Sequence, residues 1–138
     1  MFKPIIVALT FVVLSATTHA QVTIIPPDLA PDTSYRLVFV TSTEGLSQSS
    51  DLSTYDAIVQ AAADANPALD GINWQVIGST DTVDAEAHTS TNPADPVVIP
   101  IFRLDGVNVA NDYADLWDSS INSPINICLL YTSPSPRD

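Results

Sequence analysis

Tyr35-Arg-Leu-Val-Phe-Val-Thr41 is the stretch from which the fold of this chain is best read. It is rich in β-branched and aromatic residues, which favour strands. Its side chains alternate between two sets, which are Tyr35, Leu37 and Phe39 on one side and Arg36, Val38 and Val40 on the other. A period of two predicts a strand that is buried on at least one face.

The pattern changes from Asp51 onward to the period of a helix. One face carries the apolar residues Leu52, Tyr55, Ile58, Val59 and Ala62, and the other carries Thr54, Asp56, Gln60 and Asp64. Asp51 or Ser53 can cap the first turn, and Asn66-Pro67 ends the helical pattern. The sequence therefore predicts a long amphipathic helix that packs through its apolar face.

Shorter elements are expected after this helix. Residues 74–77 predict a second strand, and residues 80–96 predict a long polar loop with at most one helical turn around Asp84 to Ala87. Residues 97–104 predict a third strand, in which Pro100 requires an edge position or a bulge. Asp105-Gly106 predicts a two-residue turn with positive backbone angles, after which residues 107–109 return as a hairpin. Residues 111–118 predict a short helix, capped by Asn111, with Tyr113, Leu116 and Trp117 on one face.

The amino-terminal residues have the pattern of a secretory signal peptide. A short basic region at Met1 to Lys3 precedes an apolar stretch at Ile5 to Leu14, and small residues follow up to Ala20. The apolar stretch is shorter than the roughly 20 residues needed to cross a membrane. We therefore expect residues 1–20 to be a signal peptide, residues 21–34 to be an extended lead-in, and the protein to be secreted or displayed at the cell surface.

Residues 128–138 resemble a conceptual translation of a transposase-type sequencing-library adaptor. The natural sequence is therefore expected to be read only to about Ile127, which would leave residues 35–127 as an incomplete domain. Cys128, the single cysteine, falls in the adaptor-like stretch. The rest of the chain must then be held together by packing, without disulfides.

The charge balance is strongly acidic. The chain has 16 Asp and Glu residues against 4 Lys and Arg residues, and its formal net charge is −12. Such a surface repels nucleic acid and anionic membranes, so neither is expected as a partner.

Read in order, five blocks of this sequence resemble bacterial secreted proteins of the endostatin-like, C-type-lectin-like group. The blocks are residues 35–40, the helix that begins at Asp51, residues 74–80 with 83–85, residues 100–106, and residues 114–118 with 123–125. The resemblance spans roughly residues 35–125. Where relatives carry an arginine after the third block, this chain has Glu86, Ala87 and His88, so a shared role for that loop is not expected.

The resemblance implies an α+β fold, a truncated C-type-lectin-like domain with short antiparallel strands and one main helix. In that family the first strand pairs with a strand from the end of the domain, which here would lie beyond Ile127. It also implies a noncatalytic module for binding or adhesion, with an extracellular glycan or protein as partner. Calcium would be bound only through the later, missing half.

Asp84, Glu86 and His88 are the cluster that most resembles a chemical site. Spaced by two, they could hold a divalent cation if the stretch were extended, although zinc would require further ligands. The simpler interpretation is a solvated acidic loop. Asp112, Asp115 and Asp118 recur every three residues and are interpreted as a hydrated helix face.

The aromatic residues are interpreted as core rather than as a sugar-stacking platform, because each lies at an apolar phase of its element: Phe39, Tyr55, Trp74, Phe102 and Trp117. No nucleophile motif or phosphate-binding glycine loop is present in the sequence. We therefore assign no catalytic, cofactor-binding or metal-binding residue. The alternatives are a secreted metal-dependent hydrolase that uses Asp84, Glu86 and His88, and an envelope structural protein with a C-terminal anchor.

Overall fold

The computed structural model describes residues 25–42, 48–125 and 129–130. The expected signal peptide, the start of the lead-in and most of the adaptor-like end lie outside the described residues. The described elements, in chain order, are β1 (Arg36–Val38), β2 (Val40–Thr41), α1 (Leu52–Asp64), the 3₁₀ helix η1 (Pro67–Leu69), α2 (Ala85–His88), β3 (Ile101–Arg103), β4 (Asn108–Ala110), α3 (Tyr113–Trp117) and β5 (Leu129–Leu130).

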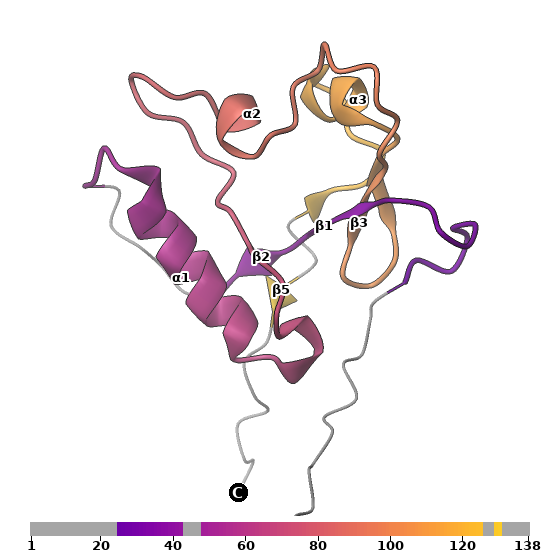
Figure 1. The fold of residues 1–138 in the computed structure, drawn as a ribbon, viewed down its shortest axis with the longest axis horizontal. Helices are drawn as coiled ribbons and strands as arrows, with labels where there is room; N and C mark the ends of the chain where they lie inside the picture. Colours follow the sequence, from indigo (N-terminus) through magenta and orange to yellow (C-terminus); the bar gives the residue numbers. More distant parts are fainter. Residues whose placement is uncertain (1–24, 43–47, 126–128, 131–138) are drawn as a thin grey trace, which may run out of the picture.

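The strands form two small sheets (Figure 1). The larger has the order β1-β3-β4, with β1 parallel to β3 and β3 antiparallel to β4. The smaller pairs β2 with β5 in parallel. A mixed fold of helices and short strands with one main helix is confirmed. The expectation of antiparallel strands holds only for β3 and β4, because β1 meets β3 after a long connection that brings the two strands side by side in the same direction.

Helix α1 forms where its pattern predicted. Asp51 is the N-cap and accepts a hydrogen bond from the Ser53 amide at 3.0 Å. Leu52, Ala62 and Ala63 are buried, and the other predicted apolar positions are half-buried. Asn66 then caps η1 by accepting from the Ala68 amide, and Pro67 occupies the first turn of η1, where a missing N–H costs little.

The loop of the β3–β4 hairpin is one residue longer than expected. Gly106 has a φ of 83°, whereas Asp105 has no positive φ, so the two-residue turn is wrong. The Gly106 amide donates to the Arg103 carbonyl and the Arg103 amide donates to the Val107 carbonyl, both at 2.9 Å. These bonds close a three-residue loop, in which a glycine at the left-handed position is the usual solution.

Pro100 lies just before the central strand of the sheet. Its carbonyl accepts the Arg36 amide at 2.9 Å, so the lack of an N–H does not interrupt the pairing with β1. The register between β3 and β4 shifts between Ile101 and Phe102. Because β3 lies between β1 and β4, the alternative of an edge strand is wrong, whereas a bulge at Pro100 itself stays a prediction.

Helix α3 is capped one residue later than expected. Asp112, rather than Asn111, accepts the hydrogen bond from the Asp115 amide at 2.9 Å. Asn111 instead donates its own amide to the Asp115 carboxylate at 2.7 Å. Tyr113, the first residue of α3, is buried in the core, where 3% of its surface stays exposed.

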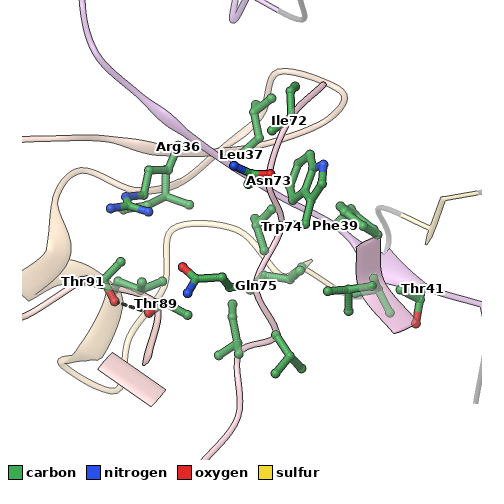
Figure 2. A pocket seen from close by; sticks show the side chains of 18 of the residues that line it. Arg36, Leu37, Phe39, Thr41, Ile72, Asn73, Trp74, Gln75, Thr89 and Thr91 are labelled. Carbon is green, nitrogen blue, oxygen red and sulfur yellow. Dashed lines mark hydrogen bonds between the residues drawn. The ribbon is translucent and has the colours of Figure 1, made fainter. Parts of the chain in front are cut away.

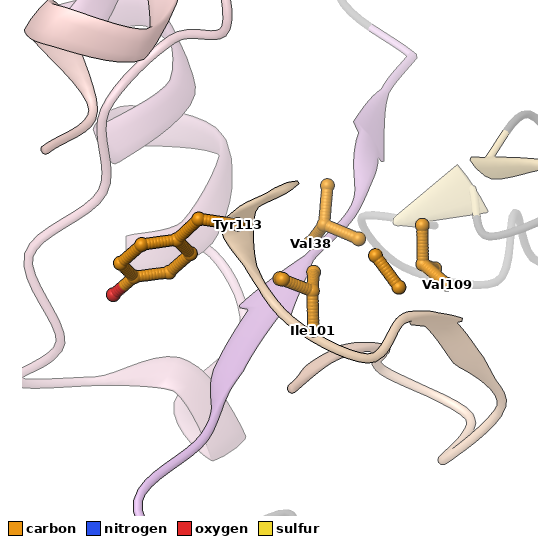
Figure 3. Close-up of a cluster of buried hydrophobic side chains, with 5 residues drawn as sticks. Val38, Ile101, Val109 and Tyr113 are labelled. Carbon is orange, nitrogen blue, oxygen red and sulfur yellow. The ribbon is translucent and has the colours of Figure 1, made fainter. Parts of the chain in front are cut away.

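Two hydrophobic clusters hold the described part together. The sheet cluster joins the three-stranded sheet to α3 and consists of Val38, Ile101, Val109, Ala110 and Tyr113 (Figure 3). The helix cluster joins the end of α1 to η1 and consists of Ala62, Ala63 and Leu69, against which Phe39, Trp74 and Leu104 pack. Phe39 lies between β1 and β2 in the sequence, so the first predicted strand contributes to both clusters.

Arg103 is a buried cation beside the sheet cluster. Its Nε donates to Asp105 Oδ1 at 3.0 Å and its Nη1 donates to the Pro124 carbonyl at 3.0 Å. The guanidinium side chain is 7% exposed and its partner Asp105 is 48% exposed. A buried charge requires such partners, and here they also tie the hairpin loop to residues near the end of the described chain.

The predicted strand at residues 74–77 belongs to no strand pair among the described residues. Alternate residues from Trp74 to Thr80 are half-buried and exposed, as in an extended chain. The described helices include none of the length and apolar character that crossing a membrane requires.

Candidate functional site

A groove of about 810 Å³ lies among the described residues. One wall is formed by residues 35–41 of β1 and β2, and the other by residues 72–77. Its remaining lining comes from α1, α3 and the segment after α2, and it is predominantly apolar. In Figure 2, Thr89 and Thr91 lie at the end of the groove away from Thr41.

Residues 72–77 are held by side chains of α1. Gln60 Oε1 accepts the Trp74 amide and Asp56 Oδ1 accepts the Val76 amide, both at 2.8 Å. Gln60 also donates from Nε2 to the Ile72 carbonyl at 3.0 Å. Asp56 and Gln60 were expected on the solvent face of α1, but they replace the strand partner that residues 74–77 lack.

His88 is connected to the same support. Its Nε2 lies 2.9 Å from Asp56 Oδ1, and its carbonyl oxygen accepts a hydrogen bond from Gln75 Nε2 at 2.9 Å. The first contact joins α2 to α1, and the second joins α2 to the wall formed by residues 72–77. His88 therefore positions this wall, and among the described residues no serine or threonine hydroxyl is hydrogen-bonded to its ring.

The cluster of Asp84, Glu86 and His88 does not assemble as a cation site would require. Residues 85–88 are helical, so side chains spaced by two do not point in the same direction. The ring of His88 turns to Asp56 instead. Across residues 25–42 and 48–125, no three His, Cys, Asp or Glu side chains are grouped as metal ligands.

The carboxylates of α3 are used in local hydrogen bonds. Asp112 caps the helix, Asp115 accepts from Asn111 and Asn122, and Asp118 accepts from the Ser120 amide at 2.8 Å. Asp112 and Asp115 are half-buried and Asp118 is exposed. Their spacing of three reflects capping of the helix and of the turn that follows it, in addition to hydration.

The aromatic residues do not form a single platform. Phe39 packs edge-on against Trp74 with ring centroids 4.7 Å apart, and Phe102 packs against Tyr35 at 6.4 Å. Trp117 Nε1 donates to the Thr91 carbonyl at 3.0 Å, and Tyr55 is bonded to Ser49. The Trp74 Nε1 is buried and finds no acceptor among the described residues, which is uncommon for a buried donor.

Arg36 is a positively charged residue that lines the groove. Its Nε donates to the Tyr113 hydroxyl at 2.8 Å, and the guanidinium lies 5.4 Å from the centre of the Tyr113 ring. Its Nη2 donates to the Ser90 carbonyl at 3.2 Å. These contacts join β1 to the segment after α2 and to α3. They therefore hold the groove wall formed by β1 in place.

The sequence predicted the two extended stretches that wall the groove, but it did not predict that a groove would lie between them. Residues 35–41 and 74–77 were both predicted as strands. No partner for the strand at residues 74–77 was evident in the sequence, and this was the only signal that a groove would lie beside it. The roles of Asp56 and Gln60 had no such signal, because polar residues on a helix face are ordinarily solvated.

Comparison with protein-family models, with curated proteins and with solved structures found no match to this chain. The groove is therefore interpreted from its own geometry.

Proposed function

We propose that this chain is a noncatalytic binding module of C-type-lectin-like fold, secreted or displayed at the cell surface, that binds an extracellular protein in the groove between residues 35–41 and 72–77. The observation that carries the proposal is the groove itself. It is large enough for several side chains of a ligand and is walled by two stretches of extended chain.

The chemistry of the lining favours a protein over a sugar. Ile72, Val76, Ile77 and Leu116 line the groove with exposed or half-buried side chains, and apolar surface of this kind is matched by apolar side chains. The indole of Trp74 is turned against Phe39, so it is not available as a flat stacking face for a sugar ring. Adhesion to an extracellular matrix protein is the role that fits an exported module with such a groove.

Ile77 provides a direct test. It lines the groove and is 49% exposed, so Ile77→Asp places a charge on the binding surface without burying it in the core. Ile121 is 41% exposed and does not line the groove, which makes Ile121→Asp a matched control. Both variants are expected to unfold at the same urea concentration as the parent chain.

The probe is immobilised denatured collagen, and binding is measured by surface plasmon resonance. We expect the parent chain and Ile121→Asp to bind alike, and Ile77→Asp to bind more weakly by a factor of about ten or greater, since burial of an unpaired charge costs more than about 1.4 kcal/mol. Equal binding by all three proteins, or no binding by the parent chain, would overturn the proposal. Binding by the parent chain to an array of soluble glycans, with none to the protein, would overturn it too.

A further inference from the structure

The open edge of β1 lies along the groove. β1 is the end strand of the order β1-β3-β4, so one of its edges faces β3 and the other has no strand partner among the described residues. The Arg36 amide donates to the Pro100 carbonyl, which places the peptide group of Arg36 on the β3 side. Because successive peptide groups of a strand point in opposite directions, that of Leu37, the middle residue of β1, is turned to the open edge.

The opposite wall does not close this edge. The amides of Trp74 and Val76 are taken by Gln60 and Asp56 of α1, so this side of the stretch is directed to the helix. Residues 72–77 consequently form a groove with β1 and β2 instead of a ladder. An edge strand of this kind is a template for an incoming strand, and proteins that do not use such an edge usually protect it.

Strand β2, which follows β1 in the chain, is paired with another extended segment. Val40 and Thr41 of β2 pair in parallel with Leu129 and Leu130 of β5. The chain next to β1 is thus able to pair with an extended segment that runs parallel to it. Recognition of that kind depends on backbone groups and on apolar side chains at alternate positions, rather than on one particular sequence.

Charge limits the ligand further. The chain carries a formal net charge of −12, which attracts cationic segments and repels acidic ones.

From these observations we infer that the groove binds its ligand by strand addition: an extended segment of another polypeptide, apolar at alternate positions and flanked by lysine or arginine, pairs with the open edge of β1 through Leu37. This inference rests on the proposed function and specifies how that function is performed. The energy comes from backbone hydrogen bonds at the edge and from alternate side chains that enter the groove.

N-methylated peptides separate strand addition from plain hydrophobic contact. The probe is the acetylated, amidated peptide Lys-Lys-Thr-Val-Thr-Val-Thr-Val-Lys, titrated into the full chain and followed by tryptophan fluorescence or calorimetry. Two further peptides carry N-methyl groups on all the valines or on all the threonines. Only alternate amides of an added strand face β1, so one methylated peptide is expected to bind about tenfold more weakly than the other.

Leu37→Pro and Leu37→Ala test the protein side of the same bond. Both lose the leucine side chain, but only the proline variant also loses the N–H at the open edge, where proline is tolerated. We expect Leu37→Pro to bind the unmethylated peptide about fivefold more weakly than Leu37→Ala. Should the proline variant fail to fold, the methylated peptides still decide the question.

The outcomes distinguish the two proposals. If the peptide binds and Ile77→Asp weakens it, but both methylated peptides bind equally, the groove is a protein-binding site and strand addition is wrong. If the unmethylated peptide does not bind while denatured collagen does, strand addition is also wrong. If neither binds, both proposals fail.

Discussion

The sheet cluster and the helix cluster differ in how their backbones are held. Around the sheet cluster, the peptide groups of β1, β3 and β4 are joined in ladders, and the side chains of Val109 and Ile101 pack over them. Around the helix cluster, residues 72–77 are extended but have no ladder, and their amides depend on Asp56 and Gln60. A ladder shares its hydrogen bonds among many residues, whereas a side-chain support depends on single ones.

This difference explains where the groove lies. On the sheet side, β3 is paired on both edges, whereas β1 and β4 each have one outer edge without a strand partner among the described residues, and the outer edge of β1 lies along the groove. On the helix side, the wall is satisfied by α1 and needs no strand. The groove therefore forms at the boundary between the two regions, along the one strand, residues 35–41, that contributes to both.

The largest effect is expected in the sheet cluster. Ile101 is 4% exposed and lies in the central strand, so Ile101→Ala removes buried methyl groups and leaves a cavity. We expect the free energy of unfolding to fall by about 3 kcal/mol. Urea denaturation followed by circular dichroism measures this loss, and Val98→Ala, at a position 72% exposed, serves as a control that should change little. A loss below about 1 kcal/mol would show that the sheet cluster is not the main core.

A smaller and more local effect is expected at Asp56. Asp56→Ala leaves the Val76 amide without its acceptor and should cost about 2 kcal/mol. Hydrogen exchange at the Val76 amide should accelerate strongly, while exchange at the Val38 amide, in the ladder, should change much less.

Asp56→Asn is the matched variant, because an amide oxygen can still accept from Val76. We expect it to restore slow exchange at Val76 even though it removes the negative charge beside His88. If the asparagine variant exchanges as fast as the alanine variant, the carboxylate acts through its charge and not as an acceptor for the wall.

The smallest effect concerns pH and the hairpin of the sheet cluster. The hydrogen bond from Arg103 lowers the pKa of Asp105 below its ordinary value of 3.8. A lowered pKa in the folded state means that the carboxylate stabilises the fold above that ordinary value, and that this contribution is lost as the pH falls through the folded-state pKa. Urea denaturation at a series of pH values from about 5 to 2 should show this loss.

Asp105→Asn should therefore lose less stability than the parent chain over that pH interval, while being less stable at neutral pH. The side chain of Asp105 is 48% exposed, so solvent screening keeps the effect small. An identical pH dependence for both proteins would show that the ion pair with Arg103 contributes nothing measurable.

Elements with a strong local period were predictable. The helix from Asp51 combines a cap, an apolar stripe and a terminating Asn66-Pro67, and these signals act within a few residues of one another. The first strand is likewise a local consequence of its β-branched and aromatic residues. The turn at Gly106 was located correctly but given the wrong length, because loop length depends on how the two strands are paired.

The candidate site was less predictable. Asp56 and Gln60 support the wall across separations of 20 and 14 residues, and His88 reaches Asp56 across 32. Spacing in the sequence suggested Asp84 and Glu86 as the neighbours of His88, but the turn of α2 separates them. Contacts of this kind follow from how elements pack, which a local pattern does not contain.

The sequence by itself determined the strand at residues 35–41, the helix after Asp51 and the acidic surface, because each depends on the residue types and their period alone. Only the tertiary structure decided that β1 would pair in parallel with β3, that α1 would satisfy the backbone of residues 72–77, and that a groove would remain between them. Whether an extended stretch finds a strand or a side chain as its partner depends on which groups packing brings within hydrogen-bond distance.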